Sequence, residues 1–258
     1  MATSPSFMNR VASFFMDIGD LVMFAKRFFR EAVSPPFEFG ALVQQCYNIG
    51  NRSLLLVGTT GFILGIVFTL QSRPTLEEFG AEAWIPSMVS ISIVREIGPV
   101  IIALICAGRI GSGMGAELGS MKVTEQIDAM EVSGTNPFKY LVVTRIVATT
   151  LMLPLLVIYG DFIAIIGSSF IEYMKGDDSF HLYFNQIFEA LEFSDLIPAT
   201  IKTFFFGFAI GLVGCFKGYN SSKGTAGVGR ASNEAVVYTS MLLFILDFIA
   251  VFITDIFY

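Results

Sequence analysis

Long apolar stretches alternate with short polar connections along most of the chain, and this alternation predicts membrane-spanning helices. A helix of about 20 mostly apolar residues is long enough to cross the hydrocarbon core of a bilayer. Five windows meet this requirement: residues 53–72, 84–107, 146–170, 196–216 and 235–257. We therefore predict an all-α integral membrane protein with five transmembrane helices.

The segment before the first window also has a helical pattern, but an amphipathic one. Apolar residues recur at helical spacing from Phe7 to Phe29, and charged side chains such as Arg10 occupy the opposite face. No compact apolar core is followed by a small-residue cleavage site, so we expect a helix in the cytoplasmic membrane interface rather than a signal peptide. A soluble helix packed on a partner protein is the alternative. We divide the chain into an interfacial region, residues 1–52, and a five-span membrane domain, residues 53–258.

Lysine and arginine are concentrated on one side of the five spans, and this bias sets the orientation of a membrane protein. Cationic residues precede the first span and occupy the connections after the second and fourth spans: Arg10, Lys26, Arg27, Arg30, Arg52, Arg109, Lys122, Lys139, Arg145, Lys217, Lys223 and Arg230. The other two connections contain only Arg73 and Lys175, beside many acidic residues. We therefore expect the N-terminus in the cytoplasm and the C-terminus on the far side.

Composition agrees with a membrane protein and narrows the function. Hydrophobic residues make up 54% of the 258 residues and charged residues only 15%, whereas soluble domains have roughly 25% charged residues. The net charge of −6 argues against a nucleic-acid partner. The sequence lacks the glycine-rich nucleotide-binding motif, a metal constellation and a nucleophile–base pair. We therefore expect no cofactor in this chain, and an energy source in another subunit or in an ion gradient.

Two spans contain rows of glycine at spacings of three and four residues, which let helix backbones approach closely in lipid. The rows are Gly58, Gly61 and Gly65, and Gly207, Gly211 and Gly214. We expect them to pack helices within the chain rather than to dimerise it. Five helices are nevertheless few to enclose a pathway, which favours a homodimer with a two-fold axis.

The second and fifth spans contain charges that lipid disfavours. Arg95 and Glu96 lie about 16 Å along the second span, at 1.5 Å per residue, and Asp247 lies at a similar depth in the fifth. An isolated charge there costs roughly 2.5 to 3.5 kcal/mol, so we expect these side chains to pair with one another and to face a cavity near the bilayer midplane. Pro99 removes one helix hydrogen bond and is expected to kink the cavity wall. The alternative is a buried ion pair that only fixes helix register.

Two further charged residues, Asp161 and Lys202, lie in the third and fourth spans, nearer the outer leaflet. Both are candidates to extend the polar lining of the cavity. For Lys202 it is equally plausible that the long side chain places its amine at the membrane interface.

The cytoplasmic connection between the second and third spans begins with four glycines and continues with a helical pattern at about residues 116–132. A short, partly apolar, acidic helix on a cytoplasmic surface favours the docking of a partner protein. A surface helix without a partner is the alternative. The side chains that carry this pattern are Glu117, Met121, Glu125, Ile127, Met130 and Glu131.

One long segment resembles a known family. Residues 95–137, REIGPVIIALICAGRIGSGMGAELGSMKVTEQIDAMEVSGTNP, are similar to the signature of the MlaE/YrbE permeases, the membrane subunits of ABC transporters that move lipids between bacterial membranes. The resemblance extends more loosely from LVQQCYNIG at Leu42, through GTAGVGRA, to the last span.

The resemblance implies an assembly and a location. It implies a homodimer in the bacterial inner membrane, with the helix at 116–132 acting as the coupling helix for a cytoplasmic ABC ATPase that binds ATP and Mg²⁺. It also implies a periplasmic MCE-domain protein on the outer face, a STAS-domain protein as a further partner, and phospholipid as the substrate.

The resemblance also implies site residues. Arg95, Glu96 and Asp247 match charged positions that line the central cavity of the family. Gln71, with its neighbour Leu70, falls where family members line the lipid pocket. Glu234 departs from the family pattern, which has a basic or neutral residue at that position, so a fixed charge-pair scheme around the fifth span is in doubt.

We therefore predict a non-catalytic permease subunit of an ATP-driven phospholipid transporter, which exchanges lipid with a periplasmic MCE partner and so maintains outer-membrane lipid asymmetry. The first alternative is an ion-coupled secondary carrier that uses Glu96, Asp161 and Asp247 as a proton relay. The second is a scaffold that anchors a soluble complex through the acidic cytoplasmic helix.

Overall fold

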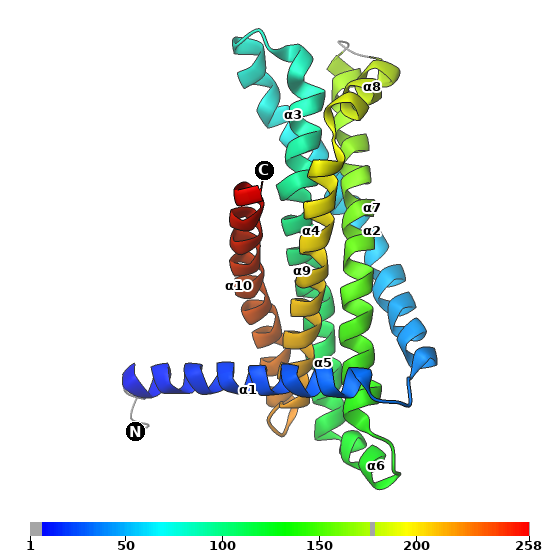
Figure 1. Cartoon of the computed structure of the whole chain (residues 1–258), viewed down its shortest axis with the longest axis vertical. Coiled ribbons are helices and arrows are strands. Elements are labelled where there is room, and N and C mark those ends of the chain that lie inside the picture. The colour runs from blue at the N-terminus through cyan, green and yellow to red at the C-terminus, as the bar shows by residue number, and fades with distance from the viewer. Residues whose placement is uncertain (1–6, 176–178, 258) are drawn as a thin grey trace.

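In the computed structural model, a bundle of long helices is crossed at one end by α1 (Figure 1). The structure describes the backbone of residues 7–175 and 179–257, and the side chains of residues 16–175 and 179–256. We call the end of the bundle that carries α8 the α8 end, and the opposite end the α6 end. The elements are α1 (Phe7–Val33), α2 (Phe39–Glu78), the 3₁₀ turn η1 (Glu82–Trp84), α3 (Ile85–Ser92), the π-helical segment η2 (Ile93–Ile97), α4 (Gly98–Cys106), the π-helical segment η3 (Ala107–Gly111), α5 (Ser112–Val123), α6 (Gln126–Val132), the π-helical segment η4 (Phe138–Val143), α7 (Thr144–Lys175), α8 (Phe180–Ala190), α9 (Phe193–Tyr219) and α10 (Thr225–Phe257).

Five helical stretches in the described part of the chain are long and apolar enough to cross a membrane, which confirms the predicted number. α2 is 40 residues long and continues from the predicted interfacial segment into the first span, so residue 52 is not a break in the helix. The second stretch, Glu82–Val123, runs from η1 through α5. A helix of 40 residues is about 60 Å long, so both stretches are longer than the hydrocarbon core is thick.

Glycines bring the helices of this bundle into backbone contact. A Cβ atom on Gly65 of α2 would overlap the carbonyl oxygen of Ala164 in α7, and one on Gly207 of α9 would lie 2.6 Å from the carbonyl oxygen of Thr149 in α7. Any larger side chain would separate these backbones, and close packing is what holds helices together in lipid. Both glycine rows therefore pack helices within the chain, as predicted.

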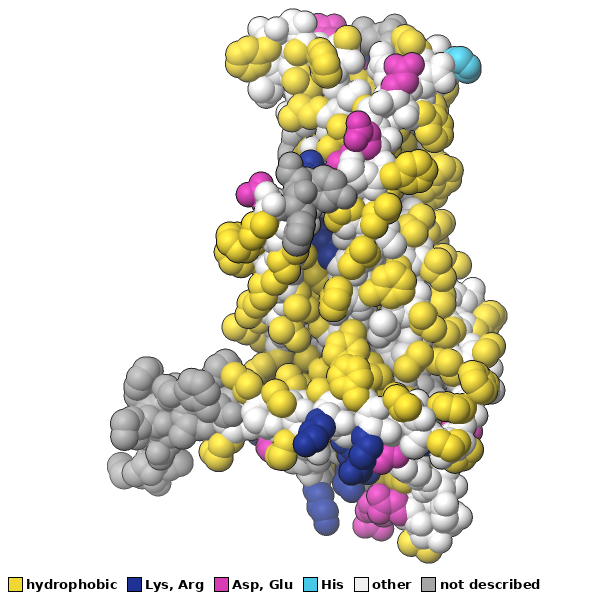
Figure 2. Space-filling view, viewed as in Figure 1, with side chains coloured by type: hydrophobic (Ala, Val, Ile, Leu, Met, Phe, Trp, Pro, Cys, Tyr) yellow, Lys and Arg dark blue, Asp and Glu magenta, His cyan; other side chains and the backbone are white. Residues whose placement is uncertain are grey.

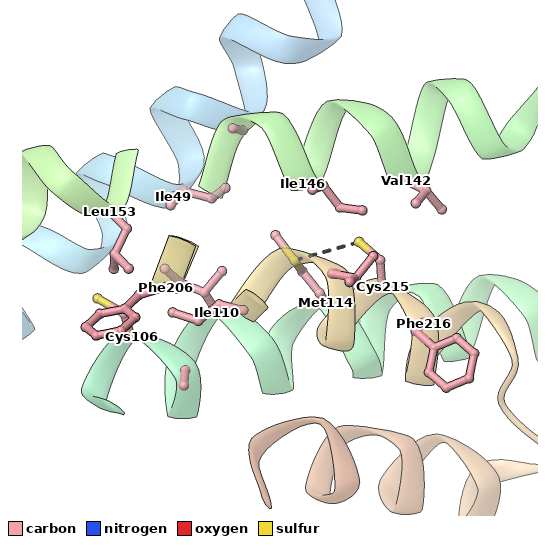
Figure 3. Close-up of a cluster of buried hydrophobic side chains, with 14 of the residues drawn as sticks. Ile49, Cys106, Ile110, Met114, Val142, Ile146, Leu153, Phe206, Cys215 and Phe216 are labelled. Carbon is pink, nitrogen blue, oxygen red and sulfur yellow. Dashed lines mark hydrogen bonds between the residues drawn. The ribbon is translucent and has the colours of Figure 1, made fainter. Parts of the chain in front are cut away.

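The main apolar core lies between α7, α9 and the stretch from α4 to α5. In Figure 3, Ile146 of α7 faces Met114 of α5 and Cys215 of α9, and the thiol of Cys215 lies 4.0 Å from the Met114 sulfur. Cys106 and Cys215 are both free and buried. They act here as small apolar residues that fill the space between helices.

α1 lies across the bundle at the α6 end rather than along it (Figure 1). Phe24 is buried, and its ring meets the rings of Phe138 and Phe216 edge-on at centroid distances of 5.0 and 5.5 Å. One face of α1 is therefore bound to the bundle. The side chains of Phe7 and Arg10, on which part of the amphipathic pattern rests, lie outside the described residues, and the location of α1 in a membrane interface stays a prediction.

The connection at the α6 end is not the single helix at 116–132 that the pattern predicts. α5 continues the second span as far as Val123, and α6 begins at Gln126. Glu125, between them, has φ = 57°, in the left-handed region that non-glycine residues seldom adopt. The amide of Thr124 bonds back to the Ser120 carbonyl, 3.0 Å away, and closes α5. The hydrophobic pattern misses this break because its apolar positions continue across it.

The hydropathy pattern does not predict α8 either. Its N-terminus is capped by Ser179, whose Oγ accepts a hydrogen bond from the Leu182 amide at 3.3 Å. Tyr183 is buried beneath the helix, and its hydroxyl lies 2.5 Å from the Ser168 hydroxyl of α7. Phe188 is 78% exposed. α8 is therefore a short amphipathic helix that covers one end of α7. The acidic residues of this connection lower its mean hydropathy, so the hydropathy pattern does not indicate the helix.

Candidate functional site

Lys202 of α9 is the centre of an ion cluster that joins three helical stretches. Its Nζ donates to Glu96 Oε2 at 2.5 Å and to Asp247 Oδ1 at 3.1 Å. The Lys202 side chain is only 6% exposed. The idea that Lys202 extends its amine to the membrane interface is therefore wrong, because the amine is held inside the protein by two carboxylates.

A π-helical segment presents Arg95 and Glu96 to this cluster. Pro99 has no N–H to bond the carbonyl of residue 95, and its ring would crowd that carbonyl in a regular α-helix. The chain instead widens over η2, where the Gly98 amide bonds to the Ile93 carbonyl. The predicted disruption at Pro99 is thus an expanded turn, a feature frequent at functional sites.

Asp161 of α7 lies against the same turn. A Cβ on Gly98 would overlap Asp161 Oδ1, so the glycine leaves the space that this carboxyl group occupies. Asp161 is buried, and its Oδ1 has no hydrogen-bond partner in the described part of the chain. Asp161 therefore packs behind the turn that carries Arg95 and Glu96, and it does not line either of the cavities next to Lys202.

The sequence suggested that Arg95 pairs with Asp247, but in the structure Arg95 does not form this pair. Its Nη1 lies 3.8 Å from Asp195 Oδ1, and its side chain is 48% exposed. Asp195 is in the first turn of α9, where it also closes a capping box with Glu192. Arg95 therefore lies beside the first turn of α9.

An apolar groove of about 760 Å³ adjoins Lys202 between α9 and α10. α10 diverges from α9 toward its C-terminus (Figure 1), and hydrophobic side chains cover much of this face of the molecule (Figure 2). Lys202 also borders a small polar pocket with Arg95 and Glu96. Apolar space with a few convergent polar groups is typical of ligand sites. The groove is lined by Ile197, Pro198, Ile201, Lys202, Phe205, Phe206, Leu246, Ile249, Ala250, Ile253 and Thr254.

Two predicted pocket residues are not part of this arrangement. Leu70, which is 44% exposed, and Gln71 lie on the surface of α2 and line neither the groove nor the polar pocket. Their role in a lipid pocket stays a prediction. Lys202, which the sequence offered as a candidate to extend the polar lining, borders both cavities, and the structure adds Asp195 to the cluster. The charge of Lys202 inside an apolar window is a signal for this residue, whereas Asp195 resembles an ordinary helix-capping residue.

The predicted coupling residues divide between an internal and an exposed group. Ile127 is buried, and Met121 and Met130 pack partly against the core. Glu125 and Glu131 are exposed at the α6 end.

Glu117 differs from the other acids of this group, because its Oε1 accepts a hydrogen bond from Arg145 Nη2 at 2.8 Å. Glu234, which departs from the family pattern, pairs with Lys217 Nζ at 3.0 Å. The Lys217 amine also lies 4.0 Å from the ring centroid of Tyr238. The charge of Glu234 is therefore compensated within the chain.

Several known proteins with similar sequences carry permease names. The family model described as "Permease MlaE" matches residues 42–253. A probable ABC transporter permease protein of Rickettsia felis is 37% identical over 250 residues, which cover 97% of this chain and 95% of the relative. A probable ABC transporter permease protein of Synechocystis sp. is 34% identical over 206 residues, 80% of this chain and 78% of the relative.

A relative with a more specific name is the intermembrane phospholipid transport system permease protein MlaE of Haemophilus influenzae. It is 34% identical over 213 residues, which cover 82% of this chain and 81% of the relative. The family match extends from α2 into α10 and so includes the ion cluster, α6 and all of the groove lining except Thr254. The chain therefore belongs to the MlaE permease family.

Proposed function

We propose that this chain is the permease subunit of an ATP-driven phospholipid transporter. The observation that carries the proposal is the ion cluster around Lys202, which borders an apolar groove of about 760 Å³. A phospholipid has a charged headgroup and long apolar tails, so each part of it meets matching chemistry here. The name of the Haemophilus influenzae relative supports the same substrate class.

Arg95 is the residue best placed to receive the phosphate of the headgroup. Its guanidinium is about half exposed, and its distance of 3.8 Å from Asp195 makes that ion pair a loose one. Guanidinium groups bind phosphate through two parallel hydrogen bonds. Glu96 and Asp247, by contrast, are already held by Lys202 and set the position of η2 and α10 around the site.

The energy and the partners come from outside this chain. We propose a homodimer in a bacterial inner membrane, with a cytoplasmic ABC ATPase against the α6 end and a periplasmic MCE-domain protein at the α8 end. A STAS-domain protein is a further partner. Glu125 and Glu131, exposed around α6, offer a contact surface to the ATPase. ATP binding would move α6, and the movement would change the width of the groove between α9 and α10.

Transport by the reconstituted complex tests this proposal. Arg95→Glu should lower ATP-dependent transfer of a fluorescent phospholipid by about tenfold, because it replaces a charge-assisted hydrogen bond with repulsion. Lys175→Glu is the matched control, since Lys175 is exposed at the α8 end outside the site. Wild-type transport by a correctly folded R95E complex would contradict the headgroup role. Transport that needs a proton gradient but no ATP would overturn the ABC transporter proposal.

One observation favours a proton-coupled carrier as the second candidate. Asp161 is a buried carboxyl group that lies next to the turn carrying Glu96 and has an oxygen without a hydrogen-bond partner in the described region. Such a group could bind and release a proton. The transport experiment separates the two candidates, because only the carrier works without the ATPase.

A further inference from the structure

A second polar cavity lies at the α6 end, where α2 meets η3, α5 and the beginning of α7. Its volume is about 270 Å³, and three arginines line it: Arg52, Arg109 and Arg145. The side-chain amides of Gln45 and Asn48 on α2 belong to the same wall. This cavity shares no residue with the Lys202 site or its groove.

The cavity carries an uncompensated positive charge. Glu117 is the one carboxylate among its lining residues, so the net charge of the lining is +2. Glu117 is already bound to Arg145, whose side chain is 4% exposed and whose Nη1 also donates to the Leu141 carbonyl at 2.8 Å. Arg109 donates to Ser53 Oγ at 2.6 Å. Within the part of the chain that the structure describes, neither Arg109 nor Arg52 has an acidic partner.

The arginine side chains that share this partly buried cavity repel each other, because they carry the same charge. An anion bound between them would be attracted to each of them and would offset this repulsion. Guanidinium groups also present their N–H donors in a rigid fork that matches the oxygens of phosphate and carboxylate. The amides of Gln45 and Asn48 add neutral hydrogen-bond donors to the wall. The lining therefore has the composition of a phosphate-binding site.

The position of the cavity in the helix bundle favours a phosphate that belongs to a lipid headgroup. Arg52 immediately precedes the apolar window of the first span, and Arg109 closely follows the window of the second, so both lie at the level expected for lipid headgroups. Leu55 and Leu56 are three and four residues beyond Arg52, on the same helix face. They are 79% and 38% exposed. An exposed apolar surface thus continues from the cavity along α2, where the acyl chains of a bound lipid would lie.

We propose that Arg52 and Arg109 bind the phosphate of a phospholipid in the membrane leaflet at the α6 end. The single negative charge of the phosphodiester lies between the two guanidinium groups, reduces the net charge of the lining from +2 to +1 and fixes the beginning of α2 against η3 and α5. This site requires only that the chain spans a membrane. It does not depend on the direction of transport or on the lipid groove at Lys202.

Native mass spectrometry of the delipidated full-length chain, titrated with dioleoylphosphatidylglycerol, tests the proposal. Arg52→Gln combined with Arg109→Gln should weaken the binding of one lipid by tenfold or more. The matched control is Lys26→Gln with Arg30→Gln, which removes two exposed positive charges from α1 outside the cavity. Binding to the control variant should equal binding to the wild type. Lipid at the Lys202 groove is unaffected in both variants, so the two sites are counted separately.

Two further ligands distinguish the lipid from other occupants. Dioleoylglycerol, which lacks the phosphate, should not occupy this site, and millimolar inorganic phosphate should not displace the phospholipid. Equal phospholipid binding to the double variant and its control would overturn the proposal. So would occupation by dioleoylglycerol, or by inorganic phosphate in preference to lipid. A double variant that keeps the lipid but no longer binds the ATPase would show that the cavity contacts a protein instead.

The single variant Arg52→Gln tests the site without the risk that the protein misfolds, because Arg52 is exposed and makes no ion pair in the described structure. This variant should elute as the wild type does in size-exclusion chromatography and should still bind the lipid more weakly. Full lipid affinity in R52Q would remove Arg52 from the site and contradict the proposed pair.

Discussion

Removing the positive charge of Lys202 should destabilise this protein, because two carboxylates share it. Lys202→Met keeps the length of the side chain but deletes the amine that Glu96 and Asp247 share. The two carboxylates then face each other across the site without a cation between them. Water cannot replace the amine fully, because the Asp247 side chain is only 20% exposed.

The expected loss of stability follows from burial. Removing one partner of a fully buried ion pair costs about 3–5 kcal/mol. Glu96 is 43% exposed, so solvent screens part of its charge, and we expect K202M to lower the free energy of unfolding by about 2–3 kcal/mol. For a domain of this size 1 kcal/mol corresponds to roughly 2–4 °C in Tm, so the expected decrease in Tm is about 5–10 °C.

Thermal unfolding of the purified chain in detergent measures this decrease. Lys175→Met is the control for the loss of one exposed lysine, and its Tm should equal that of the wild type. Adding Glu96→Gln and Asp247→Asn to K202M removes the unpaired charges and should restore most of the lost stability. A wild-type Tm for K202M, or a triple variant no more stable than K202M, would refute the conclusion that Lys202 compensates two buried carboxylates.

Three further predictions follow from single residues. Gly65→Ala should lower the free energy of unfolding by about 1–3 kcal/mol, because its Cβ would overlap the backbone of Ala164. The control Gly229→Ala, with no atom near its Cβ, should leave the Tm unchanged or raise it. Equal Tm values for the two variants would contradict the close contact of α2 and α7. Asp161→Asn should leave ATP-driven lipid transfer within about twofold of wild type, since Asp161 touches neither cavity at Lys202; a loss of tenfold or more would support a proton relay instead. Glu131→Lys should reduce lipid-stimulated ATP hydrolysis without lowering the Tm, because Glu131 is exposed on α6; normal coupling would exclude Glu131 from the ATPase contact.

The number of spans, the packing role of the glycine rows and the family could all be predicted from the amino-acid sequence. The first of these rests on local properties, because about 20 consecutive apolar residues must leave water wherever they lie in the chain. The glycine rows were also readable, since their spacing places them on one helix face. The neighbourhood of Pro99 was readable as irregular for the same reason: a proline changes its own helix whatever packs against it.

The ion pairs of the site, by contrast, follow from the way the helices are arranged in space. Lys202 is 106 residues from Glu96 and 45 residues from Asp247 in the chain. No local sequence pattern predicts that the helices carrying these three residues pack with the charged side chains facing one another. Arg95 similarly lies beside Asp195, which is 100 residues away in the chain. The break at Glu125 depends on a single left-handed residue, to which hydrophobic periodicity is insensitive. Burial and pairing are properties of helix arrangement, and that arrangement is set by contacts between residues far apart in sequence.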